Sequence, residues 1–365
     1  MLSYIVRRLL LFVPTLLAVW AILFLTIRQV GDPAIVAAGK GASAEQIASV
    51  RRQMGLDRPV FLNTEALAHG LVAIVKPAGA AERLNAKVDN PESVFHGDDL
   101  HWFHPRRPVR SLLARGFDTQ FVTSLADKLR LDFGRSVAYN QPVGRMIREG
   151  LGPSLSVTVP MFLLGLVVSV YLAMFCALYR ARLVDHTITF GCIVLMSLSL
   201  PAVILLLQHA LSGVAWFPVS GYAYGWRAAG YVALPVLIGT MLGLGQNTRF
   251  YRSVLIEEVR KDYVRTAHAK GLERGVVLFK HVLKNAMIPI VTRVVIAIPF
   301  LYAGAFLLET FFGIPGLGRM AYEALQDTDY VVIEAITFIG AMLFMVANLV
   351  CDLLYVFLDP RVRLQ

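Results

Sequence analysis

The sequence predicts an all-α membrane protein with six transmembrane helices, a large exported loop between the first two, and a basic loop on the cytoplasmic side. Three observations carry this prediction. Hydrophobic residues make up 56% of the chain, only 16% is charged, and the mean hydropathy is +0.61, well to the apolar side of a soluble protein. Long uncharged runs recur along the chain, and Lys and Arg gather in the segments between alternate runs.

The uncharged runs are long enough to be membrane helices. A bilayer core needs about 17–25 apolar residues at about 1.5 Å rise each. Most of the runs reach this length, and the last two reach it if neighbouring residues join the helix. Backbone groups in lipid must be paired within the protein, and no alternating segments typical of a barrel are present, so the runs predict helices. The six runs are Leu9–Ile27, Leu155–Tyr179, Thr187–Trp226, Ala228–Thr248, Val294–Leu308 and Ala335–Cys351.

The distribution of positive charge predicts the orientation. If the N-terminus with Arg7 and Arg8 is cytoplasmic, then 180–186, 249–293 and the tail after Asp359 lie on the same side. Ten Lys or Arg residues fall in 249–293 alone, whereas the two short loops on the other side carry one Arg each. This is a positive-inside bias, from which long translocated segments are largely exempt. Both termini are therefore expected in the cytoplasm.

The chain divides into three parts: an N-terminal transmembrane helix at 1–30, an exported segment at 31–150, and a five-helix core at 151–360 that contains the loop 249–293. In the exported segment, Ala44–Leu56 and Phe121–Phe133 have helical spacing. The first helix could also be a signal peptide. Its length and the lack of a nearby small-x-small cleavage site favour an uncleaved anchor.

Several other classes of site find little support. The net charge of +10 could indicate nucleic-acid binding, but topology explains most of it and no basic groove interleaved with aromatic residues is visible. His96, His101 and His104 invite a metal hypothesis, yet their spacing is irregular. Gly39-Lys40 resembles the end of a P-loop without the first glycine or the Ser/Thr that would hold magnesium. We therefore expect no catalytic site, no metal and no cofactor.

The three cysteines, Cys176, Cys192 and Cys351, all fall within apolar runs. Buried thiols behave as small apolar side chains. The sequence therefore predicts packing roles, and no disulfide is expected in the exported segment, which has no cysteine.

The loop 249–293 has the pattern of two amphipathic helices separated by a glycine. Gly271 stands where a helix can end in a left-handed conformation, and a second apolar pattern begins near Arg274. Such a segment could lie on anionic lipid or bind another protein closely through its small residues. The apolar positions before the glycine follow a four-residue stride: Tyr251, Leu255, Val259, Tyr263 and Ala267.

The segments Asp262–Leu272 and Lys280–Pro289 resemble the cytoplasmic EAA loop of the permease subunits of binding-protein-dependent ABC importers, and within these the oligopeptide/dipeptide/nickel permease family. The resemblance extends over about four-fifths of the chain. Further segments that resemble the family are Tyr4–Leu10, Gly31–Pro33, Gly55–Pro59, Asp132–Ser136, Ile314–Gly318 and Asp359–Arg361.

The resemblance implies a coupling helix that docks in a groove of a separate ATPase. It implies an assembly in a bacterial inner membrane with a second permease subunit, two ATP-binding subunits or domains, and a periplasmic or lipid-anchored substrate-binding protein. ATP-driven closure would then tilt the membrane helices between two states. Carried over by motif, the coupling residues are Arg265, Thr266, Ala267, His268, Ala269, Lys270 and Gly271.

The chain departs from the family pattern in three places. His268 stands where arginine is frequent, and Val331 follows Asp329-Tyr330 where proline is usual. The exported segment also carries additional sequence at about 64–120, about which the resemblance says nothing. This insertion could be a docking surface for the binding protein or a decoration without a role of its own, and docking is the preferred interpretation.

Polar residues inside the apolar runs are candidates for the translocation path. Such groups are costly at membrane depth and usually face a cavity or another helix, although hydrogen bonding between helices explains each of them equally well. Pro160, Pro201, Pro235 and Pro299 are expected to kink their helices and open space nearby. The candidates are Ser197, Ser199, Gln208, His209, Gln246, Asn247 and Asn348.

The predicted function is transport of peptides or similar small solutes, with ATP hydrolysis left to partner subunits. Nickel or another small solute is an alternative within the family. A secondary transporter would need intramembrane acid pairs or an inverted repeat, and neither is visible. A membrane-anchored scaffold would not need the glycine-broken loop.

Overall fold

The computed structural model describes residues 2–30, 33–38, 42–53, 56, 60, 119–211, 218, 220–303 and 305–358. The chain falls into two compact units, Trp20–Phe133 and a larger unit of Met1–Val19 with Gly134–Gln365. Among the described residues no β-strand occurs, and one isolated bridge pairs Arg135 with Pro142. The prediction of an all-helical protein is confirmed for this part of the chain. The insertion at about 64–120, the three histidines, Gly39-Lys40 and the tail motif lie outside it almost entirely.

The smaller unit contains short helices joined by local hydrogen bonds. They are α2 (Pro33–Ala38), α3 (Ala44–Gln53) and α7 (Gln120–Leu129). α3 begins with a capping box, because Ser43 N donates to Gln46 Oε1 (2.8 Å) and Gln46 N donates to Ser43 Oγ (3.3 Å). Both helices expected in 31–150 are present, each ending a few residues earlier than its apolar pattern.

An aromatic cluster orders this unit. Phe24 meets Phe121 edge to face with ring centroids 5.4 Å apart, a favoured geometry for aromatic pairs. Trp20 is fully buried and its Nε1 donates to the carbonyl oxygen of Phe121 (3.3 Å). These residues connect α7 to the second half of α1 (Leu2–Val30), a helix that is divided between the two units.

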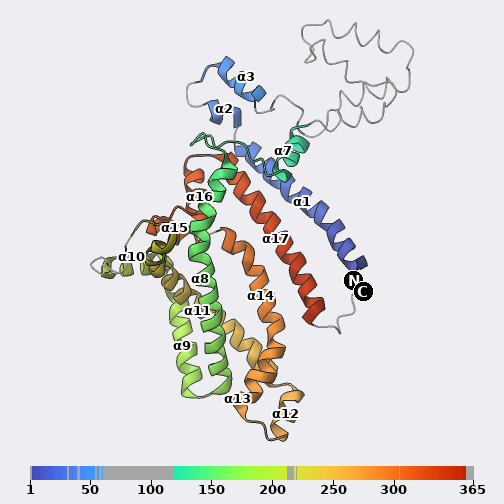
Figure 1. The fold of residues 1–365 in the computed structure, drawn as a ribbon, viewed down its shortest axis with the longest axis vertical. Coiled ribbons are helices and arrows are strands. Elements are labelled where there is room, and N and C mark those ends of the chain that lie inside the picture. The colour runs from blue at the N-terminus through green and yellow to red at the C-terminus, as the bar shows by residue number, and fades with distance from the viewer. Residues whose placement is uncertain are drawn as a thin grey trace. The chain divides into compact units, whose positions relative to one another are not determined.

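The larger unit is built on long helices joined by short ones (Figure 1). α8 packs extensively on α11, α11 also packs on α9, and α14 packs on α17 and α8. The elements in chain order are α8 (Val143–Leu178), α9 (Leu183–Ser197), α10 (Leu200–Leu211), η2 (Gly225–Arg227), α11 (Ala228–Val259), α12 (Asp262–Ala269), α13 (Arg274–Val277), η3 (Leu278–Val282), α14 (Leu283–Ala303), α15 (Phe306–Phe312), α16 (Leu317–Gln326) and α17 (Tyr330–Leu358).

Four helical stretches among the described residues are long and apolar enough to cross a membrane: Val143–Leu178, Gly225–Val259, Arg274–Tyr302 and Tyr330–Asp352. The pair α9 and α10 adds a fifth if it counts as one broken span. The described apolar part of α1, Phe12–Thr26, is shorter than the other spans. The multi-span fold is confirmed, whereas the count of six is not.

Two predicted spans have different shapes in the structure. The run Thr187–Trp226 is not one straight helix, because α9 and α10 meet at a bend of 93° just before Pro201. Pro201 lies in the first turn of α10, where its missing N–H removes no intrahelical hydrogen bond, whereas in the middle of one continuous helix it would. The run Val294–Leu308 is also divided: α14 begins at Leu283 and ends at Ala303, and Leu308 belongs to the separate helix α15. The hydrophobic runs correctly located the apolar residues, but they did not predict the breaks between α9 and α10 and between α14 and α15.

Prolines inside the other spans do not end their helices. α8 continues through Pro160, α11 through Pro235 and α14 through Pro299. The three cysteines are buried and free, as expected of packing residues.

Buried carboxylates organise the end of the larger unit where α15 and α16 lie. Glu309, fully buried, accepts hydrogen bonds from Ser154 Oγ (2.7 Å), Ala305 N (3.1 Å) and Arg319 N (3.0 Å). A Cβ on Gly316 would collide with the Glu309 carboxylate. The Ile314–Gly318 motif therefore lets a loop and the start of α16 close over a buried acid.

A second buried carboxylate joins two segments far apart in the sequence. Asp329 caps α17 by accepting from Val332 N (3.4 Å), and it also accepts from Ser136 Oγ and from Ala138 N (3.2 Å). The cap satisfies a backbone donor at the start of the helix. Val331, at the position where proline is usual in the family, lies beside Gly134, where a Cβ would be 3.9 Å from its Cγ1.

Candidate functional site

The segment predicted to couple the protein to a partner forms a short helix between two breaks. α11 ends at Val259 and α12 begins at Asp262, so the four-residue stride from Tyr251 to Ala267 spans two helices instead of one. α12 ends as expected before Gly271, whose φ of +78° lies in the left-handed region. Leu272 N donates to Ala267 O (3.3 Å) across this turn. The predicted helix–glycine turn–helix arrangement is confirmed from Asp262 onward.

One face of α12 is buried in the core of the larger unit. Val264 and Ala267 are 3% and 7% exposed. They pack in an apolar cluster with residues from the neighbouring ends of α8, α11, η3 and α14, among them Ala173, Leu255, Val282 and Ala286. Ala267 therefore contacts this chain's own core, although the motif placed it among residues that approach a partner.

The opposite face of α12, which we name the outer face, is exposed and basic. Large apolar side chains continue it onto α13 and η3, with Val276 and Phe279 exposed by 44% and 54%. Arg265 makes an exposed ion pair with Asp262 (3.4 Å), a type of contact that contributes little. The outer face comprises Arg265, Thr266, His268, Ala269, Lys270, Gly271 and Leu272.

A hydroxyl adds one directional contact to the buried side. Tyr263 Oη donates to Glu258 Oε1 (3.0 Å), and Lys261 Nζ lies 2.6 Å from Glu258 Oε2. Burial raises the pKa of the Tyr263 phenol above its ordinary value, so this group stays a protonated donor. The contact connects α12 to the end of α11 across the break at Arg260.

An ion pair with a buried carboxylate fixes the neighbouring helices. Arg252 on α11 binds Asp185 at the start of α9 through two hydrogen bonds, of 2.7 Å and 2.8 Å. Ala181 N also donates to the Asp185 carboxylate (3.1 Å). Two parallel bonds of this kind are geometrically specific. Sequence reasoning missed this pair because its members are 67 residues apart and each lies near other charged residues.

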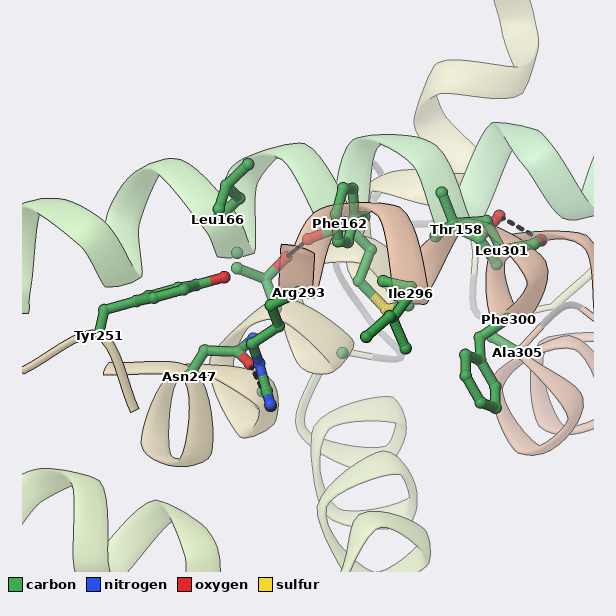
Figure 2. Close-up of a pocket in the computed structure, with 16 residues that line it drawn as sticks. Thr158, Phe162, Leu166, Asn247, Tyr251, Arg293, Ile296, Phe300, Leu301 and Ala305 are labelled. Carbon is green, nitrogen blue, oxygen red and sulfur yellow. Dashed lines mark hydrogen bonds between the residues drawn. The ribbon is translucent and has the colours of Figure 1, made fainter. Parts of the chain in front are cut away.

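A cavity of about 480 Å³ lies between α8, α11 and α14. Its lining follows the helical repeat on each of them, and Figure 2 shows the side chains from the three helices converging on it. On α8 the lining residues are Thr158, Met161, Phe162, Gly165 and Leu166. On α11 they are Gly239, Thr240, Gly243, Asn247 and Tyr251.

The α14 side of the cavity carries a charge. Arg293 lines it together with Ile296, Ala297, Phe300 and Leu301. Arg293 Nη2 donates to Asn247 Oδ1 (3.2 Å), and the guanidinium carbon lies 4.6 Å from the centroid of the Phe250 ring. Sequence reasoning placed Arg293 at the edge of the basic loop and did not name it as a path residue. The signal that could have found it is the apolar sequence on both sides of Thr292-Arg293, from Met287 to Phe300.

The candidate path residues are distributed over different surfaces. Asn247 lines the cavity, and the other six do not. Ser197 donates to its own helix at Ile193 O (2.9 Å), and Gln208 donates to Phe311 O (3.1 Å). The other four are exposed: Ser199 in the bend before α10, His209 on α10, Gln246 on α11 and Asn348 on α17. Among the described residues, no group of three His, Cys, Asp or Glu side chains is placed to hold a metal ion.

Comparison with known proteins gives consistent results over the whole chain. Residues 165–364 match the family described as binding-protein-dependent transport system inner membrane component, and residues 1–83 match the N-terminal family of such membrane components. The chain is 28% identical to a probable peptide ABC transporter permease protein, y4tP, of Sinorhizobium fredii over 369 residues, covering 99% of each chain.

Glutathione transport system permease proteins named GsiC are similar to the same extent. The protein of Salmonella choleraesuis is 29% identical over 368 residues, covering 100% of this chain and 99% of its own. That of Escherichia coli K12 is 28% identical over 368 residues with the same coverage. The family match at 165–364 spans more than half of the chain and includes α11, α14 and the α12 segment, and the chain belongs to the family of inner membrane components of binding-protein-dependent transport systems.

Proposed function

We propose that this permease imports peptides or similar small solutes and that the outer face of α12 docks on a separate ATPase. The relatives with a peptide or glutathione transport name support the substrate class, since they match the chain from end to end. The proposed solute path runs beside α8, α11 and α14, where the cavity lies.

The observation that carries the coupling role is the two-sided construction of α12. Its inner face, Val264 and Ala267, is packed into the helix ends, while its outer face is exposed. A force applied to the outer face would therefore reach α8, α11 and α14 through close contacts. Packed interfaces of this kind move as bodies between discrete arrangements rather than deforming gradually.

The remaining partners and the orientation belong to the same proposal. The assembly has a second permease subunit, two ATP-binding subunits and a periplasmic or lipid-anchored substrate-binding protein, and ATP is hydrolysed in the ATP-binding subunits. Both termini and α12 face the cytoplasm, which the excess of Lys and Arg in 249–293 supports. The segment 31–150 is exported, and its additional sequence contacts the binding protein.

Replacing Gly271 tests the coupling role. Valine at Gly271 must adopt a φ near +78° or deform the turn, and left-handed backbone costs non-glycine residues about 1–2 kcal/mol. Gly275 is the matched control, because it lies in α13 and a Cβ there also meets nothing within 4 Å. The assembled complex with Gly271→Val should hydrolyse ATP but lose binding-protein-dependent peptide uptake, whereas Gly275→Val should retain it.

The measurement is uptake of labelled peptide into proteoliposomes per ATP hydrolysed. Normal uptake by Gly271→Val would contradict the assignment of α12 as the coupling helix. Failure of the unmodified complex to take up any peptide would instead contradict the proposed substrate class.

A further inference from the structure

An arginine within a candidate membrane span requires a physical explanation. Arg293 lies in the stretch Arg274–Tyr302 and points into the cavity between α8, α11 and α14 (Figure 2). A charged side chain in the middle of a membrane helix costs about 2.5–3.5 kcal/mol on insertion scales, and such residues usually mark solute or ion pathways.

The contacts of Arg293 orient its guanidinium without neutralising it. Asn247 accepts one hydrogen bond from Nη2, and the ring of Phe250 lies against the guanidinium carbon. An arginine has several N–H donors in a planar fork. Among the residues that the structure describes, none of the ion pairs includes Arg293. The Arg293 guanidinium is therefore a positive charge in a fixed position at the cavity wall, and it has N–H groups that can donate to a solute.

The cavity carries its charge at one end and mostly apolar side chains at the other, where the one hydroxyl labelled in Figure 2, of Thr158, donates to Leu301 O. Asn247 and Tyr251 lie on the side of Arg293, whereas Phe300 and Leu301, two turns further along α14, line the other end. The volume of about 480 Å³ falls within the range of small-molecule sites. This arrangement suits a solute with an anionic group at one end and an apolar body.

We propose that Arg293 binds the carboxylate of the transported solute, with Asn247 and Phe250 as positioning residues. This inference rests on the proposed function. The planar guanidinium can donate two parallel hydrogen bonds to a carboxylate, which an amide at the same place would accept less well. The cavity therefore selects solutes with a free carboxylate over neutral analogues, in addition to any selection by the binding protein.

The first test compares trialanine with its C-terminal amide, each presented as saturated binding protein to the reconstituted complex. Arg293→Gln should lower the ratio of acid to amide uptake rates by about tenfold, equivalent to about 1.4 kcal/mol. Asn247→Asp places a competing carboxylate beside the guanidinium and should lower the ratio similarly while Arg293 is still present. Arg145→Gln, an exposed residue paired with Glu149, is the control and should leave the ratio unchanged.

A second test does not need transport. Ala297 lies one turn from Arg293 on the cavity face of α14, so Ala297→Cys reports occupancy through its rate of alkylation by N-ethylmaleimide. Trialanine should slow the alkylation more than its amide does, and adding Arg293→Gln should abolish the difference. The assay runs in nanodiscs of phosphatidylcholine and, in parallel, of phosphatidylglycerol.

Equal protection by acid and amide in the unmodified Arg293 background, or an unchanged uptake ratio in Arg293→Gln, would overturn the proposal. Protection by phosphatidylglycerol and not by trialanine would also overturn it and assign the cation to a lipid headgroup. If the complex takes up neither peptide while trialanine still protects the Ala297→Cys variant from alkylation, the proposed peptide function fails and carboxylate binding stands.

Discussion

In the larger unit, α12 is held in place by different forces from the segments around α15 and α16. At one end, α12 rests on α8, α11 and α14 through apolar side chains, with the Tyr263 hydroxyl as a directional contact. At the other end, Glu309 and Asp329 are buried carboxylates, and each accepts three hydrogen bonds, one of them from a serine more than 150 residues earlier in the chain. Apolar contacts are non-directional, whereas hydrogen bonds to charged groups require defined geometry.

Because of this difference in contacts, we expect α12 to be able to shift and the segments bonded to Glu309 and Asp329 to stay fixed. Apolar contacts do not fix a hydrogen-bonding geometry, so α12 and the helix ends packed against it can move together as one body while α12 stays buried. A buried carboxylate that loses its donors pays a large desolvation penalty. We therefore expect changes at the carboxylate end to alter stability, and changes at α12 to alter coupling.

Glu309→Ala is expected to have the largest effect. It removes the acceptor of Ser154 Oγ and of two backbone N–H groups, and each buried donor left unpaired costs about 1–3 kcal/mol. The apparent Tm of the purified protein, followed by size-exclusion chromatography after heating, should fall strongly. Glu149→Ala, which removes an exposed carboxylate, is the control. A similar Tm for both variants would remove the distinction between the two ends.

Asp329→Ala removes the acceptor of Ser136 Oγ, Ala138 N and Val332 N, and it should destabilise the protein less, by about 1–2 kcal/mol, because the two backbone bonds are long, at 3.2 and 3.4 Å. Asp329→Asn retains an acceptor and should recover part of the loss. Both variants should keep the unmodified ratio of solute transported per ATP hydrolysed, which is measured in proteoliposomes. A changed ratio would show that this end also takes part in coupling.

Gly271→Ala should cost about 1 kcal/mol locally, since alanine must adopt the left-handed conformation. Gly275→Ala makes the same chemical change inside a helix and should be neutral or stabilising. Hydrogen exchange of α12 amides should increase in the first variant while the apparent Tm changes little. A fall in Tm as large as that of Glu309→Ala would mean that α12 is part of the fixed frame.

The smallest effect on stability is expected for Arg265→Gln. Arg265 and Asp262 form an exposed ion pair, and such pairs contribute little to stability. The apparent Tm should therefore stay unchanged, whereas the salt dependence of ATPase stimulation should weaken if the outer face meets the partner. An unchanged salt dependence would place the docking contact on other outer-face residues.

The membrane fold and the family could be predicted from the sequence because their signals are local. Uncharged runs marked most of the spans, and Gly271 marked the end of α12, since helix ends and hydropathy depend on neighbouring residues. The family motifs added the outer-face residues, of which Arg265, His268 and Lys270 are exposed as docking requires.

Other features depend on contacts between residues far apart in the chain. The apolar stride placed Ala267 with Tyr251 and Leu255, and all three are buried in one cluster, but periodicity could not show the break at Arg260 that divides the stride between two helices. Of the polar residues predicted to line the solute path, only Asn247 lines the cavity. Arg293 was recognised as a lining residue only from the structure, through its contacts with Asn247 and Phe250.

The sequence by itself determined an all-helical membrane permease with a glycine-broken basic segment, because hydrophobicity, charge and glycine act locally. Only the tertiary structure decided where α11 ends and α12 begins, where α9 and α10 bend, and which charged side chain lines the cavity. The physical reason is that packing and hydrogen bonding join helices across many residues, and no local pattern records which side chains will meet.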